Sequence, residues 1–204
     1  FESEYKNGQK VKYTHFKNGQ KQYETNYENE KKNGQEKSWN DFNQVESLKD
    51  FRYGVKISET SFLYYPNGQL EKEMNYRGDG FTKDGKQSYW YEDGQIQREH
   101  NYKNGRQQDT TAWNEIGQKT SLSYYLNNRL SKQIRFKYYE NNQVKEEAHL
   151  DMSNINPVYI YLLRWHENGQ KSLEVNYKDG KKDGRSTVWY QSGQKMSEVN
   201  YKNG

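Results

Sequence analysis

A pattern of thirteen residues recurs along this chain and limits what it can fold into. The clearest copy runs from Trp189 to Tyr201 and reads Trp-Tyr-Gln-Ser-Gly-Gln-Lys-Met-Ser-Glu-Val-Asn-Tyr. Aligned on the Gly-Gln pair, eight copies begin at residues 15, 39, 64, 90, 113, 138, 165 and 189. All five tryptophans occupy the first position, and Gln fills the sixth position of every copy. Self-similarity at a fixed period is the signature of repeat architectures, so we predict one repeat array over residues 1–204 with partial units at both ends.

Each copy predicts two short strands joined by a turn. A run around the first aromatic leads into Asn-Gly, Asp-Gly or a similar pair, and a second run ends at another aromatic, which is a strong hairpin signal. The fifth position is Gly in six copies and Asn in two, the residue types that best tolerate positive φ. We therefore assign structural turn roles to Gly19, Asn43, Gly68, Gly94, Gly117, Asn142, Gly169 and Gly193.

The second run of each copy alternates in polarity. Positions eleven and thirteen face one side, as Met74 with Tyr76 and Val175 with Tyr177 do, whereas positions ten and twelve are mostly Glu and Asn. A period of two is typical of a half-buried antiparallel strand. The connectors contain Lys-Asn-Gly or Lys-Asp-Gly, which predict a second turn between hairpins. The predicted fold is all-β, an elongated single-layer antiparallel meander of about eight hairpins, and its structural aromatics are Trp39, Trp90, Trp113, Trp165, Trp189, Tyr76, Tyr102 and Tyr177.

Composition agrees with a thin structure. Only 30% of the residues are hydrophobic and the mean hydropathy is −1.50, which by itself suggests disorder. Aromatic residues make up 16% of the chain, and each buries a large area, so regularly placed rings can cover a sheet. The chain has no Cys, starts at Phe1 without a Met and ends within a repeat, and we expect both ends to have been cut from a longer protein.

One apolar run stands out between the copies that begin at residues 138 and 165. Residues 158–163 read Val-Tyr-Ile-Tyr-Leu-Leu, the longest such run in the chain. An ordinary buried strand is the favoured interpretation. The alternative is an exposed interface formed by Val158, Tyr159, Ile160 and Tyr161.

The sequence offers no constellation for catalysis. Position ten is Glu in six copies, and one slot repeated along an array favours a structural role over acid–base chemistry. The four histidines are scattered, so we expect no metal site, and no phosphate-binding or nucleophile motif occurs. The net charge of +4 is finely mixed along the chain, which argues against a nucleic-acid partner. We expect no enzyme activity and no cofactor.

The repeat resembles a known family. The pattern Tyr-x-Asn-Gly-Gln-x-x-x-Glu-x-Asn-Tyr-Lys-Asn-Gly-Lys-x-x-Gly is similar to the MORN repeat and closest to its bacterial variant, with the best match from Trp165 to Gly184. The resemblance implies consecutive β-hairpins in a twisted sheet and no shared catalytic residues. It also implies two kinds of role: bacterial members are often labelled antitoxins, whereas eukaryotic relatives are associated with phospholipid binding and scaffolding.

These observations leave four functional hypotheses. The first is a non-catalytic scaffold that binds a protein through its aromatic-rich sheet. The second is recognition of glycans or cell wall at a bacterial surface, suggested by aromatic rows beside amides. Toxin neutralisation and peripheral lipid binding rest on the resemblance, and lipid ranks lower because the sequence shows no basic stripe. A secreted or cell-surface location is slightly favoured over the cytoplasm.

Overall fold

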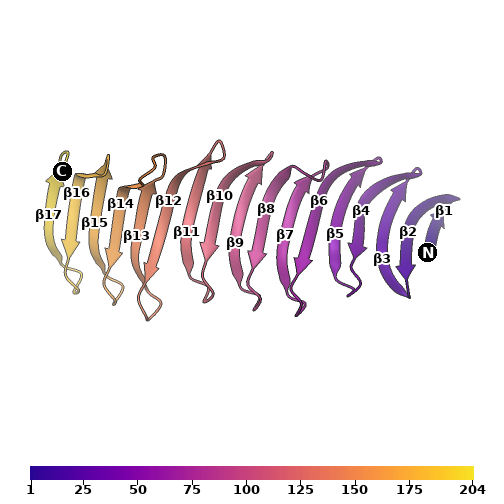
Figure 1. Ribbon diagram of the computed structural model, residues 1–204, viewed down its shortest axis with the longest axis horizontal. Coiled ribbons are helices and arrows are strands. Elements are labelled where there is room, and N and C mark those ends of the chain that lie inside the picture. The colour runs from indigo at the N-terminus through magenta and orange to yellow at the C-terminus, as the bar shows by residue number, and fades with distance from the viewer. The chain divides into compact units, whose positions relative to one another are not determined.

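The computed structural model describes residues 1–204 and contains seventeen β-strands and no helix (Figure 1). Since the chain forms no helix, it has no helix that could span a membrane. The residues group into two compact units, 1–106 and 107–204, which are described separately. The first unit holds β1 (Glu2–Lys6), β2 (Gln9–Lys17), β3 (Gln20–Glu28), β4 (Lys31–Trp39), β5 (Val45–Arg52), β6 (Val55–Tyr64), β7 (Leu70–Arg77), β8 (Lys83–Trp90) and β9 (Ile96–Lys103).

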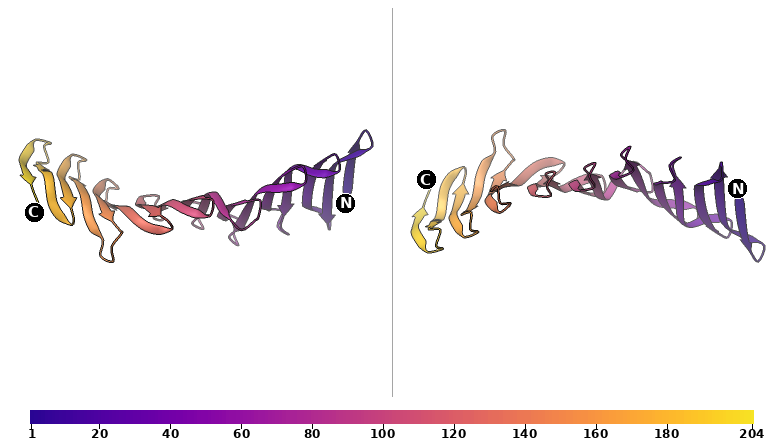
Figure 2. Two further views of the ribbon diagram at one scale, coloured as in Figure 1. Left: turned by 90° about the horizontal axis from the view of Figure 1, so that it is seen from above. Right: turned by 90° about the horizontal axis from the view of Figure 1, so that it is seen from below.

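The second unit continues the same pattern. It holds β10 (Arg106–Trp113), β11 (Lys119–Leu126), β12 (Arg129–Tyr138), β13 (Val144–Asp151), β14 (Val158–Trp165), β15 (Lys171–Lys178), β16 (Lys181–Trp189) and β17 (Lys195–Tyr201). Within each unit, consecutive strands pair antiparallel, as β6 with β7 and β14 with β15 do. Each unit is a single layer of strands with no second sheet on either face (Figure 2). The predicted all-β antiparallel meander of hairpins is confirmed.

Two kinds of connection alternate between the strands. Seven connections are five-residue loops that follow the aromatic of position one: residues 40–44, 65–69, 91–95, 114–118, 139–143, 166–170 and 190–194. Because strands alternate in direction, these loops lie on one edge of their unit, which we call the wide-loop edge. The opposite, tight-turn edge carries mostly two-residue turns in which both residues have positive φ, such as Asn127-Asn128 and Asp179-Gly180.

Three connections depart from this alternation. The β2–β3 connection lies on the wide-loop edge but is a two-residue turn, Asn18-Gly19, with φ of 52° and 78°. On the tight-turn edge, β7–β8 and β13–β14 are joined by longer loops, residues 78–82 and 152–157. In the first of these, Gly78 lies so close to β6 that an added Cβ would meet the Lys56 carbonyl oxygen at 1.9 Å, so only glycine fits.

Strand register places alternate repeat positions on opposite faces. On β7, Glu73 and Asn75 oppose Phe62 and Thr60, whereas Met74 and Tyr76 oppose Ser61 and Glu59. Positions ten and twelve therefore share one face, and positions eleven and thirteen share the other.

The two units differ in what they bury. The buried residues of the first unit are all polar: Thr14, Thr25, Glu36, Ser47, Gln87 and Ser88. The second unit buries aliphatic side chains, namely Ile134, Ala148, Leu150, Leu162 and Val175. Ala148, Leu162 and Val175 oppose one another across β13, β14 and β15 and form an apolar row. The first unit depends instead on hydrogen bonds, ion pairs and ring contacts.

Candidate binding surface on the wide-loop edge

All seven five-residue loops share one backbone frame. The first residue donates its N–H to the carbonyl of the fifth, and the fourth donates to the carbonyl of the first, as in Tyr65 N to Gln69 O (2.8 Å) and Gly68 N to Tyr65 O (2.9 Å). The fourth residue has positive φ in every loop, from 60° at Asn43 to 89° at Gly68. The frame therefore demands Gly or Asn at this residue and leaves the others free to vary.

In five loops, the side chain of the third residue caps the backbone N–H of the fifth residue. Asn67, Asp93, Asn141, Asn168 and Ser192 each accept a hydrogen bond from the backbone N–H of the following Gln. Such side-chain caps are typical of Asn, Asp and Ser in turns. We call these five loops regular loops. In a regular loop the third residue has a structural role, because its side chain caps the backbone.

Two loops use a different cap and expose an apolar third residue. In residues 40–44, Asn40 Oδ1 accepts from both Phe42 N and Gln44 N at 3.0 Å, and Phe42 is 85% exposed. In residues 114–118, Asn114 takes the same role and Ile116 is 66% exposed. Moving the cap to the first residue releases the third residue from the backbone. The third residue of these two loops therefore exposes an apolar side chain to water.

Regular loops also bond to the next loop along the edge. Their first residue is mostly Tyr or His, and Tyr65 Oη donates to Trp90 O (2.7 Å) while Tyr139 Oη donates to Trp165 O (2.8 Å). The Gln of position six lies against the next loop, as Gln44 does in donating its Nε2 to Gly68 O at 3.1 Å. Gln118 does the same by donating its Nε2 to Asn142 Oδ1 at 2.8 Å. This contact gives a structural role to the Gln of these two copies.

A groove adjoins Phe42 in the first unit. It measures about 560 Å³ and lies between loops 40–44 and 65–69, with walls from Asn40, Phe42, Gln44, Glu46, Phe62, Leu63, Tyr64, Tyr65, Pro66, Asn67 and Gly68. Tyr64 donates its hydroxyl to Val45 O at 2.8 Å, and burial raises the pKa of this phenol, so it stays neutral. The groove is lined by rings and side-chain amides, with Glu46 as its one charged residue.

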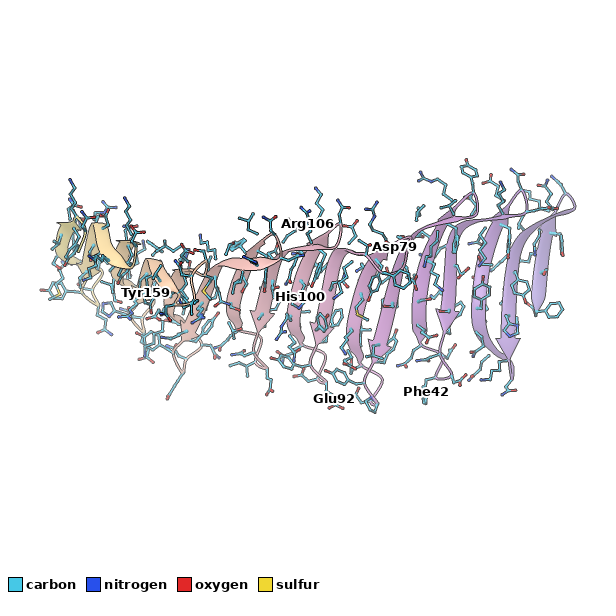
Figure 3. All side chains as sticks on the ribbon, turned by 45° about the horizontal axis from the view of Figure 1, so that its top comes forward. Phe42, Asp79, Glu92, His100, Arg106 and Tyr159 are labelled. Atoms are coloured by element: carbon cyan, nitrogen blue, oxygen red, sulfur yellow. The ribbon has the colours of Figure 1, made fainter.

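Charge is distributed unevenly between the two edges. The seven loops contain Asp41, Glu92, Asp93, Glu115, Glu140 and Glu167 and no Lys or Arg. All six are exposed, and the one ion pair among them joins Asp41 to Lys17 at 3.2 Å. The connections of the tight-turn edge of the first unit contain Glu30 and Asp79 and no Lys or Arg, but Lys or Arg flanks every one of them. The flanking cations are Lys6, Lys31, Arg52, Arg77, Lys83, Lys103 and Arg106, and Glu28 is the one flanking carboxylate. Figure 3 shows Phe42 and Glu92 on the wide-loop edge and Asp79 on the opposite edge.

The sequence-assigned turn and aromatic residues lie in the frame rather than at a site. Gly19, Asn43, Gly68, Gly94, Gly117, Asn142, Gly169 and Gly193 all have positive φ, and Gly19 differs only in belonging to a two-residue turn. The tryptophans each end a strand before a loop and are half-buried, as are Tyr76, Tyr102 and Tyr177. Lysines lie over several of the rings, such as Lys83 over Tyr102 with Nζ 5.1 Å from the centroid.

The apolar run Val158, Tyr159, Ile160 and Tyr161 forms the first half of β14, which pairs with β13 and β15. Tyr159 is 40% exposed and packs against Tyr177, with the ring planes tilted by 33° and the ring centroids 5.6 Å apart. Tyr161 contacts His149 edge to face at 5.2 Å, and burial with the nearby Glu174 carboxylate raises its pKa to about 12. The run is thus a strand hydrogen-bonded on both sides, and its role as an interface stays a prediction.

Two buried carboxylates elsewhere in the chain are paired with cations. Glu36 accepts from Tyr23 Oη (2.6 Å) and from Lys32, and Glu146 binds Lys137 (2.8 Å) and Arg164 (2.7 Å). Burial raises the pKa of both carboxyls, but the hydrogen bonds from these cations outweigh it and the net pKa is lowered. No group of three His, Cys, Asp or Glu side chains is placed to hold a metal ion. In each of these clusters the charge of the carboxylate is compensated by the cations that bind it.

Sequence reasoning missed Phe42 and Ile116. A signal was available, because these two residues are the apolar members of a position otherwise filled by Asn, Asp or Ser. In both copies the exchange coincides with Asn two residues earlier, at Asn40 and Asn114. An apolar third residue together with Asn at the first residue of the loop therefore identifies the two altered loops from the sequence.

Comparison with known proteins identifies the repeat. A family model described as MORN repeat variant matches residues 60–77, 83–104, 134–151, 162–179 and 182–203. Each match covers a hairpin that closes with a five-residue loop, and the two such hairpins left out are β4–β5 and β10–β11, which carry Phe42 and Ile116. Comparison with curated proteins gives no match.

Similar solved structures include the crystal structures of TcdB2-TccC3-TEV and TcdB2-TccC3-Cdc42. Both have a TM-score of 0.29, with 9% and 11% sequence identity, and they match 94% of this chain. This chain covers 14% and 13% of theirs, and at such a TM-score the likeness carries no argument about fold or function. The recurring hairpin frame and the five matched stretches lead to one conclusion: the chain is a MORN-repeat protein built from repeats of the variant type.

Proposed function

We propose that this chain is a non-catalytic repeat scaffold that binds a protein partner through the wide-loop edge of its first unit, with Phe42 as the anchor. The observation that carries the proposal is the altered cap of loop 40–44. Asn40 takes over both backbone donors, and the released Phe42 is 85% exposed beside a groove of about 560 Å³. An exposed ring next to an apolar groove is the composition found at the centre of protein interfaces.

Two further features support a protein partner. The groove combines aromatic rings, an aliphatic side chain and amides, which fits the mixture of apolar and hydrogen-bonding groups in a peptide segment. The family model passes over the β4–β5 hairpin, as it does the β10–β11 hairpin that carries Ile116, so the hairpins with an apolar third loop residue depart from the repeat pattern.

The test compares two matched variants of the full chain. Phe42→Asn restores the residue type of a regular loop, and Phe81→Asn removes a ring of similar exposure (88%) from the opposite edge. Both should unfold within about 0.5 kcal/mol of the wild type, because neither ring is buried. In affinity capture from extracts of the source cells with quantitative mass spectrometry, a protein should be retained by the wild type and by Phe81→Asn and lost with Phe42→Asn.

A protein set that is identical for all three chains would contradict the proposal. Retention of purified glycan or cell-wall material in a Phe42-dependent manner would replace it with carbohydrate recognition. Crosslinking from a photoreactive amino acid at position 42, compared with one at position 81, gives an independent readout of the same contact.

A further inference from the structure

The charges around the Phe42 groove constrain what can occupy it. Glu46 is the one charged residue in the groove walls, is exposed and forms no ion pair. The next loop along the edge carries Glu92 and Asp93, both exposed. Asp41 is already neutralised by Lys17 at 3.2 Å. An occupant that runs from the groove toward loop 91–95 therefore meets uncompensated carboxylates and no Lys or Arg of either loop.

The spacing of the loops sets the spacing of the complementary charges. Neighbouring wide loops are two strands apart, or about 10 Å at the usual distance between strands. Loops 65–69 and 91–95 contact each other directly, since Asn67 Nδ2 donates to Glu92 O at 3.0 Å. An extended peptide advances about 3.3 Å per residue. A peptide lying along this edge therefore passes from one loop to the next in about three residues.

We propose that the occupant is an extended basic segment of a protein, with an apolar residue in the Phe42 groove and Arg or Lys about four to five residues away, opposite Glu92 and Asp93. The groove lies between loops 40–44 and 65–69, so loop 91–95 is about one and a half loop spacings from it. This inference rests on the proposed function and names the chemistry of the partner. Glu46 faces a second cation or the peptide N–H groups near the anchor. Opposite charges at a partly exposed interface steer association and favour one class of partner over its acidic counterparts.

Three synthetic peptides of eleven residues test the proposal against the full chain by fluorescence anisotropy. Each carries a central Leu in a Ser/Gly background. They differ in having Arg four residues to either side of the Leu, Glu at those two places, or Arg directly beside the Leu. The first peptide should bind most tightly and the Glu peptide least. Binding should weaken as salt rises from about 50 to 200 mM, since the Debye length falls below the loop spacing.

Variants of the chain locate the contact. Phe42→Asn should weaken binding of the first peptide at least about tenfold, as loss of a central aromatic anchor does. Glu92→Gln and Glu46→Gln should each weaken it and flatten the salt dependence. Glu30→Gln, an exposed carboxylate in a turn on the opposite edge, is the matched control and should leave the affinity unchanged.

The outcomes separate this inference from the function it rests on. If Arg and Glu peptides bind equally and both depend on Phe42, the basic partner is excluded and the docking function stands. If the Arg peptide binds regardless of Phe42, the groove is not the site and both proposals are overturned. If the Arg peptide does not bind even at millimolar concentration, the basic segment is excluded, and capture from extracts still tests the docking function.

Discussion

At the scale of the residue, a single side chain can satisfy backbone hydrogen-bonding groups that a shift in strand register leaves without a partner. The register between β7 and β8 shifts between Met74 and Tyr76, so Asn75 has no opposed residue on β8. Gln87, which is fully buried, fills the gap: its Oε1 accepts from Asn75 N at 3.1 Å and its Nε2 donates to Asn75 O at 2.7 Å. A side-chain amide here replaces one residue of backbone ladder.

Replacing Gln87 by Leu should therefore destabilise the first unit. The change keeps the approximate size of the side chain but leaves a buried N–H and C=O unpaired, which costs about 2 kcal/mol or more. Urea unfolding followed by tryptophan fluorescence measures the difference. Gln35→Leu, at an exposed position whose side chain makes no hydrogen bond, should change stability by less than about 0.5 kcal/mol, and an equal loss in both variants would refute the role of Gln87.

Glu36 makes the first unit sensitive to acid. Burial raises its pKa, but hydrogen bonds from Lys32 and Tyr23 prevail, and the folded-state pKa lies below the ordinary value of 4.5. A lowered pKa contributes stability that is present above pH 4.5 and is lost as pH falls through the folded-state pKa. Urea midpoints of the wild type should drop below pH 4.5, and Glu36→Gln should flatten that drop. An unchanged slope in the variant would assign the acid sensitivity to other carboxyls.

At the scale of the element, different residues of a wide loop have different structural roles. The first residue either binds the next loop, as Tyr139 does, or caps its own loop, as Asn40 does. In the first arrangement the loops stabilise each other, and in the second the tip becomes available for contact with another molecule.

Tyr139→Phe tests the link between loops. It removes the hydroxyl that donates to Trp165 O at 2.8 Å and should lower the free energy of unfolding by about 1 kcal/mol. Tyr190→Phe is the matched control, because Tyr190 holds the same place in loop 190–194, is 52% exposed and makes no such hydrogen bond. Chemical denaturation should show no change for the control, and equal effects would indicate that the hydroxyl contact is not stabilising.

Hairpins, alternating faces and positive-φ residues could be predicted because each depends on nearby residues. The form of a turn could not. Asn-Gly-Gln occurs both at Asn18, in a two-residue turn, and at Asn67, in a five-residue loop, so the same three residues take two conformations. Pairing of the flanking strands decides between them. The groove at Phe42 likewise depends on two loops separated by more than 20 residues, which no local pattern describes.

At the scale of the whole molecule, topology sorts charges that the linear sequence mixes. Wide loops, most of them acidic, alternate along the chain with turns that are mostly flanked by Lys or Arg, so no run of like charge forms. Because the strands alternate in direction, every second connection returns to the same edge. In the first unit the wide loops therefore carry carboxylates and no Lys or Arg, whereas the tight-turn edge has many flanking cations together with Glu28, Glu30 and Asp79. The net charge of +4 conceals this difference.

Stability should also be local in an array of this kind. Strands contact mainly their sequence neighbours, so a defect is felt first where it is made. Val175 is 1% exposed in the apolar row of β15, whereas Val199 holds the same repeat position in β17 at 47% exposure. Val175→Ala should cost about 2 kcal/mol and speed hydrogen exchange in β14 to β16, with β2 to β5 unchanged. Val199→Ala is the control, and faster exchange throughout the chain would show global cooperativity instead.

The first residue of a wide loop is Asn in the altered loops and Tyr or His in the regular loops. This difference also suggests a way to engineer the scaffold. Placing Asn at the first residue of any wide loop transfers the cap away from the tip, as loops 40–44 and 114–118 already do. The tip could then be randomised in a library without disturbing the backbone that carries it. Each such graft would give up one hydroxyl or imidazole contact to the next loop, so neighbouring loops should be kept regular and grafts spaced along the edge.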